Sequence, residues 1–376
     1  MSNQMITLAN LSFPRAELLK AQLANEGVSA YLTNLNQIQG SPPASKVQVQ
    51  EEDLPVAMRI LRIIEQEYGP EEIEEEEKKR KDRILIPVDF SNAAEKSIAF
   101  SLSLANKINA DIKLLHTYFN PALGMAPFNE SITYQDAMAS YIRDLHIKAK
   151  TKLIKLTNDI QKQIQANNIK GVTVDYFLTM GDSAVEILRI SKQFNPNVIV
   201  MPIRLSEEKE NNLISAITAN VIDNAKHPVL AIPEHFDKQD IWEIKNILYI
   251  ATYDQHELKA IKNLMRLVVP VTGAKIHVLQ IYEGEKPKAA EYQMQVIEEF
   301  FNRYNKIEFT STDLHCKSKE SVEKINHYIE DNNIHTLSLV NYKQNLIGRL
   351  LYPSIARKMV FHSKTPLLVF PDKKTR

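Results

Sequence analysis

Glycine is scarce in this chain. Nine glycines occur among 376 residues, whereas average usage is near 7 per cent. No two of them stand close enough to form GxGxxG or GxxxxGK[ST]. Both motifs require glycine because backbone N–H groups must approach a phosphate closely and some positions need a positive φ. The common backbone phosphate cradles are therefore excluded.

Cysteine pairs, net charge and long apolar runs are also absent. Cys316 is the only cysteine, which rules out an intramolecular disulfide and a thiolate zinc site. Lysine plus arginine and aspartate plus glutamate number 46 each, so no long-range field attracts nucleic acid or an anionic membrane. No stretch approaches the roughly 20 apolar residues that span a bilayer, and the N-terminus has no signal-peptide pattern. These absences predict a soluble cytoplasmic protein that binds neither nucleic acid nor membrane.

Motifs for catalysis and metal binding are missing as well. The sequence contains no HExxH, no histidine pair spaced i,i+4 and no GxSxG. His116, at the end of a predicted strand, is interpreted as an ordinary residue of the sheet edge. We therefore expect no metal site and no enzymatic activity. Four further histidines share the C-terminal region without a ligand spacing: His315, His327, His335 and His362.

A charged block divides the chain into a small head and a large body. Residues 71–83, EEIEEEEKKRKDR, place glutamates four residues before lysines or arginine. Such pairs stabilise an exposed helix by a few tenths of a kcal/mol each. The block is predicted to be a helical linker, with a binding tail as the alternative. The head is residues 1–70.

Strand and helix patterns alternate in the body. ILIPVDFS (84–91) and ADIKLLHTY (110–118) are short apolar runs that enclose a helical pattern. Further strands are predicted at 172–178, 197–203 and 228–233, with an amphipathic helix after the first of them. This alternation predicts a mostly parallel α/β sheet with helices on both faces.

The same pattern then returns. Residues 321–340 match residues 183–202 without a gap, and KTPLLVFP (364–371) overlays KHPVLAIP (226–233) at the same offset. A single offset across a helix and two strands is typical of a duplicated domain. We therefore predict two domains, at residues 84–236 and 237–376.

The head has its own alternation. Strand, helix, strand, strand and helix patterns follow one another, which predicts a small α+β (βαββα) unit with its helices on one face. The helix containing AELLKAQLANEGV and the later EEDLPVAMRIL resemble a family of small signal-transducing domains that are similar in fold to PII-type regulators. That resemblance implies a protein partner or small metabolite as the ligand of the head.

The body resembles the universal stress protein family. The likeness rests on the strand ending in VDFS, on the closing Pro-Val-Leu strand, and on the duplication. It implies two doubly wound, five-stranded Rossmann-like domains, each in strand order 3-2-1-4-5. It also implies pairing through the last strands, PVLAI and PLLVF, as an intramolecular pseudo-dimer. A homodimer of the whole chain remains open.

In nucleotide-binding members of the family, an aspartate after the first strand contacts adenine, and a glycine-rich segment after the fourth strand holds ribose and phosphates. Asp89 matches the aspartate. Met201, Arg204 and Ser215 would complete a vestigial pocket for ATP or AMP, but the glycines are replaced by Pro202, Leu205 and Ser215-Ala216. In the alternative interpretation Arg204 is a solvated loop residue, and Asp89 caps the helix that starts near Asn92.

The second repeat departs further from the family pattern. Thr252 stands where Asp89 stood, and Pro353 removes an N–H that a phosphate site would use. Ser354 is the remaining candidate in this loop, with a helix N-cap as the alternative role. Residues 119–135 are predicted to hang over the carboxyl edge of the first sheet, either as a packed loop or as a flap for a ligand or partner.

Three functions follow from these observations. The first is a non-enzymatic stress-response or signalling scaffold or sensor with degenerate nucleotide sites and no required cofactor. The second is an adenine-nucleotide binder, with slow hydrolysis as its extreme form, that uses only the first repeat. In the third the head is the sensing element and the body its platform.

Overall fold

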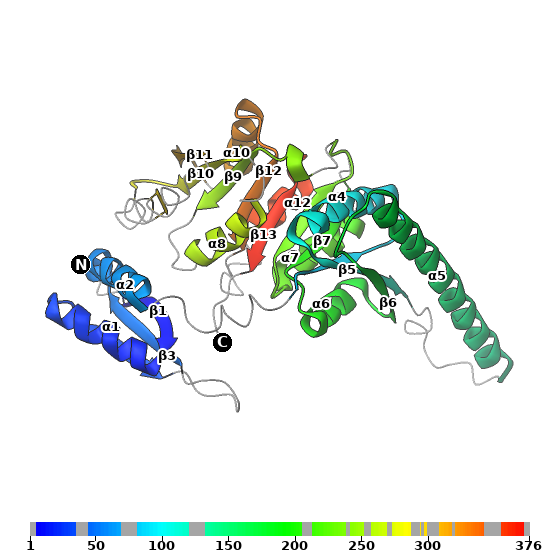
Figure 1. Cartoon of the computed structure of the whole chain (residues 1–376), viewed down its shortest axis with the longest axis horizontal. Helices are drawn as coiled ribbons and strands as arrows, with labels where there is room; N and C mark the ends of the chain where they lie inside the picture. The colour runs from blue at the N-terminus through cyan, green and yellow to red at the C-terminus, as the bar shows by residue number, and fades with distance from the viewer. Residues whose placement is uncertain are drawn as a thin grey trace. The chain divides into compact units, whose positions relative to one another are not determined.

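The computed structural model (Figure 1) describes two compact units. The described residues are 5–34, 44–68, 81–119, 132–204, 213–237, 241–251, 257–268, 273–286, 294, 297–298, 308–317, 320–341 and 355–371. Most of the predicted linker and Leu205, Thr252, Pro353 and Ser354 lie outside them. So does most of the predicted flap at 119–135.

The head is a three-stranded antiparallel sheet packed against helices. Its sheet has the order β1-β3-β2. Val47 and Val49 of β3 pack with Leu19 of α1 and Ala57 of α2 in one apolar core. The elements are β1 (Met5–Ser12), α1 (Phe13–Asn25), β2 (Ala30–Asn34), β3 (Ala44–Gln50), η1 (Glu51–Asp53) and α2 (Leu54–Tyr68).

The body is a large, mostly parallel α/β sheet with helices between its strands, as the alternation of patterns predicts. Its first half contains β4 (Arg83–Pro87), α4 (Asn92–Ile108), β5 (Asp111–Tyr118), α5 (Ile132–Ala166), β6 (Val174–Met180), α6 (Ser183–Phe194), β7 (Val198–Ile203), α7 (Leu213–Asn224) and β8 (Val229–Pro233). Its second half contains η3 (Ile241–Glu243), β9 (Asn246–Ala251), α8 (Glu257–Val268), β10 (Lys275–Tyr282), β11 (Glu308–His315), α10 (Ser321–Asp331), β12 (Thr336–Asn341), α12 (Ile355–His362) and β13 (Leu367–Pro371).

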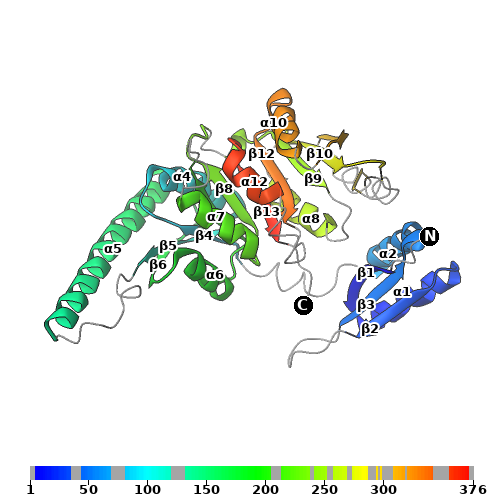
Figure 2. The ribbon, with the colours of Figure 1, turned by 180° about the vertical axis from the view of Figure 1, so that it is seen from behind.

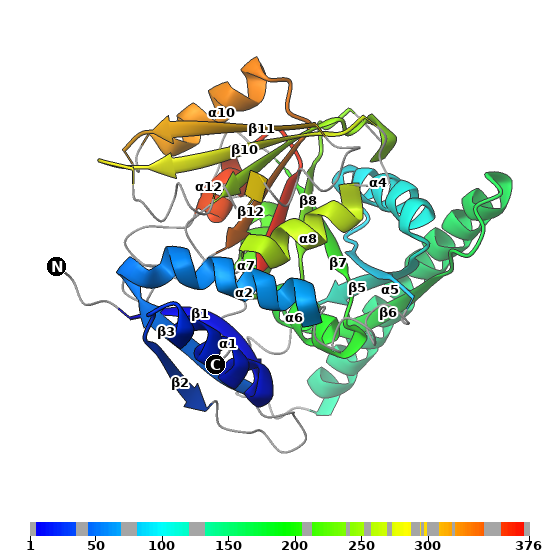
Figure 3. The same cartoon turned by 60° about the vertical axis from the view of Figure 1, so that its left-hand side comes forward.

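Ten strands form the sheet of the body, in the order β11-β10-β9-β12-β13-β8-β7-β4-β5-β6. Central strands such as β4 are apolar and buried after their first residue because helices cover both faces of a parallel sheet. β4 begins at Arg83, one residue before the predicted domain boundary. Figure 3 shows β10 and β11 side by side at one edge, next to α10.

The two halves of the body meet at β8 and β13. These two strands pair antiparallel, with Val229 opposite Val369. Two contacts between side chains and the opposite half support the junction. Arg357 of α12 forms an ion pair with Asp223 of α7 (Nη1–Oδ2 2.6 Å), and the Nδ2 of Asn341 donates to the carbonyl of Ile222 (3.1 Å).

One apolar core runs through both halves. It contains Leu85 and Ile199 from the first half, and Leu248 and Leu367 from the second. Residues of α6, α7, α10 and α12 belong to it, and α7 and α12 lie in front of the sheet in Figure 2. Residues 81–251, 259–284 and 303–376, which include most of both predicted domains, belong to one compact unit. Among the described helices, none is long and apolar enough to cross a membrane.

Candidate functional site

The carboxyl ends of β4 and β7 form the candidate site. These strands are neighbours in the sheet, yet the chain leaves β4 toward β5 on one side and reaches β7 by crossing to the other. Open α/β sheets bind ligands in the crevice at such a switch point. Asp89 follows β4 and Arg204 follows β7, so both predicted residues lie at this edge.

Asp89 is exposed, and its carboxylate braces a turn. Its Oδ1 accepts hydrogen bonds from the backbone N–H of Ser91 (3.0 Å) and from the Ser91 hydroxyl (2.6 Å). The Oγ of Ser91 in turn accepts from the N–H of Ala94 (3.3 Å), which makes Ser91 the N-cap of α4. The sequence-based alternative that Asp89 itself caps this helix is therefore wrong, because Asp89 acts one step away, through Ser91.

Phe90 and Lys152 belong to the same edge and were missed from the sequence. The Phe90 ring lies 4.5 Å from the His116 ring, centroid to centroid, and the Lys152 Nζ lies 5.6 Å above the Phe90 ring. Phe90 has a φ of 61°, the left-handed conformation that a bulky residue adopts only at some cost. The hydrogen bonds of the Asp89–Ser91 turn stabilise this backbone conformation and hold the Phe90 ring against the His116 ring.

His116 is tied to the end of β4. Its Nδ1 lies 2.7 Å from the carbonyl oxygen of Val88. Because a carbonyl only accepts, Nδ1 donates, and in the neutral ring Nε2 is left as an acceptor. Burial lowers the pKa of His116 below its ordinary value of 6.5, against the opposing effects of the Val88 carbonyl and the Asp89 carboxylate. The neutral imidazole is thus the favoured form in the folded protein.

This lowered pKa makes folding pH-dependent. As the pH falls below about 6.5, the unfolded chain takes up the proton on His116 before the folded chain does, so the free energy of unfolding falls. Replacing His116 by glutamine keeps a donor for Val88 and removes the titration. Gln280 already occupies the matching position of β10 in the second half, when ADIKLLH (110–116) is aligned with AKIHVLQ (274–280). We expect the free energy of unfolding to fall less between pH 7.5 and pH 5.5 in His116→Gln than in the wild type, measured by urea denaturation. Equal slopes would contradict the assignment.

Arg204 and Ser215 hold each other in place. The Ser215 hydroxyl accepts from the backbone N–H of Arg204 (3.1 Å) and donates to its carbonyl (2.7 Å). Ser215 is fully buried, so this bridge closes the base of the segment between β7 and α7. The Arg204 Nε donates to Glu234 Oε2 (2.9 Å) in an ion pair. Arg204 is therefore paired within the protein, while 40 % of its side chain stays exposed to solvent.

Met201 is 2 % exposed and packs in the core of the body, so its side chain is turned away from the crevice. In the second half, Asn341 is the last residue of β12, at the corresponding edge. Its side-chain Nδ2 donates a hydrogen bond to the carbonyl of Ile222. The structure therefore brings Asp89, Arg204 and Ser215 to one edge, with each group hydrogen-bonded within the protein.

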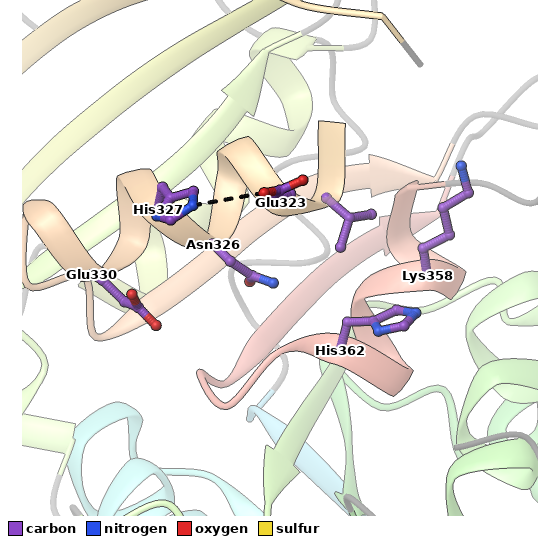
Figure 4. Close-up of a pocket in the computed structure, with 7 residues that line it drawn as sticks. Glu323, Asn326, His327, Glu330, Lys358 and His362 are labelled. Carbon is purple, nitrogen blue, oxygen red and sulfur yellow. Dashed lines mark ion pairs between the residues drawn. The ribbon is translucent and has the colours of Figure 1, made fainter. Parts of the chain in front are cut away.

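A second concavity lies between α10 and α12, away from the predicted pocket. It is a groove of about 520 Å³ lined by Glu323, Asn326, His327 and Glu330 on one helix and Lys358 and His362 on the other. Figure 4 shows His327 directed toward Glu323, at 4.0 Å. Within the described part of the chain, no group of three histidines, cysteines or carboxylates is placed to hold a metal ion. The groove has mixed charge and defines no single ligand.

The comparisons with known proteins bear on the segment that contains this edge. A family model, that of the universal stress protein family, covers β4 through β8. Residues 81–233 match this family. Asp89, Met201, Arg204 and Ser215 all lie inside the universal stress protein segment, whereas the second half lies outside it. Among curated proteins the chain has no match.

A solved structure supports this fold. A universal stress protein from Archaeoglobus fulgidus DSM 4304 superposes with a TM-score of 0.58 at 18 % identity, over 77 % of this chain and 96 % of that one. The universal stress protein UspA from Lactobacillus plantarum gives a TM-score of 0.32 at 16 % identity, over 41 % and 97 %. A universal stress family protein from Burkholderia pseudomallei gives 0.28 at 19 % identity, over 40 % and 96 %. The first of these similarities extends the shared fold across both halves of the body.

Proposed function

We propose that the chain is a cytoplasmic stress-response or signalling protein of the universal stress type that acts as a non-enzymatic scaffold or sensor. The observation that carries this proposal is the double hydrogen bond between Ser215 and the backbone of Arg204. The Ser215 hydroxyl and the Arg204 backbone N–H lie where contacts to phosphate are expected, but they are hydrogen-bonded to each other. The Arg204 guanidinium is matched by Glu234, so an incoming phosphate would have to break that ion pair.

Calorimetry on the full chain tests this proposal. We expect no heat of binding for ATP or AMP at micromolar concentrations, and no adenine nucleotide in the mass spectrum of ligands released by heating freshly purified protein. A micromolar dissociation constant for either nucleotide, or co-purified nucleotide, would overturn it. Ser215→Gly is the informative variant, because it opens the bridge and removes the Cβ that glycine-containing family members lack.

The alternative is adenine-nucleotide binding through the first half alone. Its support is the exposed carboxylate of Asp89 at the switch point, whose charge acts on the nearby His116. If this function holds, ATP raises the melting temperature of the wild type but not of Asp89→Ala. Asp144→Ala removes an exposed carboxylate from α5 and serves as the control, in which the ATP effect should persist. An equal ATP response in Asp89→Ala would remove the alternative.

We also propose that the body arose by duplication of one five-stranded domain, so that the pairing of β8 with β13 is an intramolecular pseudo-dimer. The antiparallel register and the ion pair between Arg357 and Asp223 support this view. An intramolecular junction forms at any protein concentration. The head would then add a PII-like sensing element for a metabolite or partner. Deleting residues 1–70 should abolish the cellular stress response and leave the body folded, and a full response without the head would contradict this role.

A further inference from the structure

The connection between the second and third strands differs greatly between the two halves. From β5 to β6 the chain uses residues 119–173, whereas from β10 to β11 it uses residues 283–307. The second half therefore makes the same connection with fewer than half the residues. Much of the additional length in the first half is α5, which lies beside β5 and β6 and extends past them (Figures 1 and 2). Covering the sheet does not require so long a helix.

One side of α5 explains its place on the sheet. Ala149, Leu153, Ile160 and Ile164 are buried, and the helix packs against β5 and β6. Their spacing of four and seven residues marks a single inward face. The residues on the outward face of α5 are turned away from the sheet, so packing on the sheet does not account for them.

The outward face carries an apolar line. Ile147 is 53 % exposed and Ile154 is 37 % exposed, with the exposed Thr151 between them. Residues seven apart lie almost above one another on a helix, about 10.5 Å apart along its axis. Each isoleucine thus leaves apolar surface in water on the side of α5 opposite the sheet.

Two cationic lines flank the isoleucines. Arg143 and Lys150 follow one side, and Lys148 and Lys155 follow the other, each pair again seven residues apart. All four are exposed, and none forms an ion pair within the part of the chain that the structure describes. Between residues 138 and 158 the only carboxylate is Asp144. We call Arg143, Ile147, Lys148, Lys150, Ile154 and Lys155 the α5 stripe.

We propose that the α5 stripe is a docking surface for an acidic amphipathic helix of a partner protein. In paired helices, apolar heptad positions lie between flanking charged positions, and α5 presents one such apolar line, Ile147 and Ile154, between its two cationic lines. The unpaired cations select glutamates and aspartates on the flanks of the partner helix, and the isoleucines take its apolar residues. This surface is separate from the nucleotide edge and stands whichever nucleotide result is obtained.

Two other anionic partners fit the stripe less well. A helix that lies in a membrane surface presents its broad apolar face to the lipid, but the broad apolar face of α5 is turned to the sheet. Nucleic acid requires cations without an apolar line, and the net charge of the whole chain is zero. The test includes both as competitors.

Fluorescence anisotropy with the full chain provides that test. The probe is a labelled synthetic helix with leucine at the two apolar positions of each heptad and glutamate at the flanking positions. We expect saturable binding that weakens about ten-fold in the double variant Lys148→Glu, Lys155→Glu, a change equivalent to about 1.4 kcal/mol. The double variant Lys170→Glu, Lys192→Glu makes the same charge change at exposed residues outside α5 and should bind like the wild type.

The other possible outcomes also either support or overturn the proposal. Ile147→Ser combined with Ile154→Ser should weaken the probe without lowering the urea midpoint of the protein, because both side chains are exposed at the surface. Equal weakening in the Lys170, Lys192 control would show non-specific attraction and overturn the proposal. So would absence of binding, or tighter binding to phosphatidylserine vesicles or to a DNA duplex than to the acidic helix.

Discussion

Replacing Val369 by aspartate is expected to unfold the body of the protein. Val369 is 2 % exposed and faces Val229, itself 1 % exposed, across the β8–β13 junction. A carboxylate there would be buried in the apolar core that contains both valines, and such burial costs several kcal/mol. Because native domains are stable by only about 5 to 15 kcal/mol, we expect a loss of about 4 kcal/mol or more. Urea denaturation followed by far-ultraviolet circular dichroism measures it.

The same substitution at an exposed valine supplies the control. Val185 is 60 % exposed and lies in the first turn of α6, where an additional carboxylate is favoured by the helix dipole. Val185→Asp should therefore change the free energy of unfolding by no more than about 0.5 kcal/mol. If Val369→Asp kept the wild-type midpoint, the junction between the halves would not be part of the folded core.

Much of the body could be predicted because its signals are local. Each central strand, such as β7, is a short apolar run, and helices such as α6 show amphipathic spacing, so their alternation gave a mostly parallel α/β sheet. The family resemblance implied that the last strands of the two halves pair, and β8 and β13 do pair. The register that places Val229 opposite Val369 could not be predicted from local patterns, because it is set by packing between segments far apart in the chain.

The candidate site shows the same division. The position of Asp89 at the end of a strand, and therefore at the carboxyl edge, followed from the pattern. The tilted ring contact between Phe90 and His116 did not, because it requires β4 and β5 to be neighbours and a left-handed backbone at Phe90. The ion pair of Arg204 with Glu234 joins residues 30 positions apart through the adjacency of β7 and β8. A capping serine at position 91 was the one missed feature with a local signal, since serine before an alanine-rich helix is a common N-cap.

Replacing Leu248 by alanine is expected to loosen both halves of the body together. Leu248 lies on β9 in the second half, is fully buried, and belongs to the core that also contains Leu85 of the first half. A buried leucine truncated to alanine leaves a cavity and typically costs about 2 to 5 kcal/mol. If the body is one cooperative unit, this loss lowers the opening free energy of the amides in β4 as much as that of the amides in β9. Hydrogen exchange followed by mass spectrometry reports both sets in one experiment.

Leu213→Ala gives the matched comparison, because Leu213 is 73 % exposed at the start of α7, and we expect exchange near the wild-type rate in both halves. Two independent domains would behave differently, with faster exchange in β9 and unchanged protection in β4 of Leu248→Ala. That outcome would mean that the continuous sheet and core do not couple the halves energetically. Equal loss on both sides would instead mean that a change in the second half reaches the edge that holds Asp89 and Arg204, through packing alone.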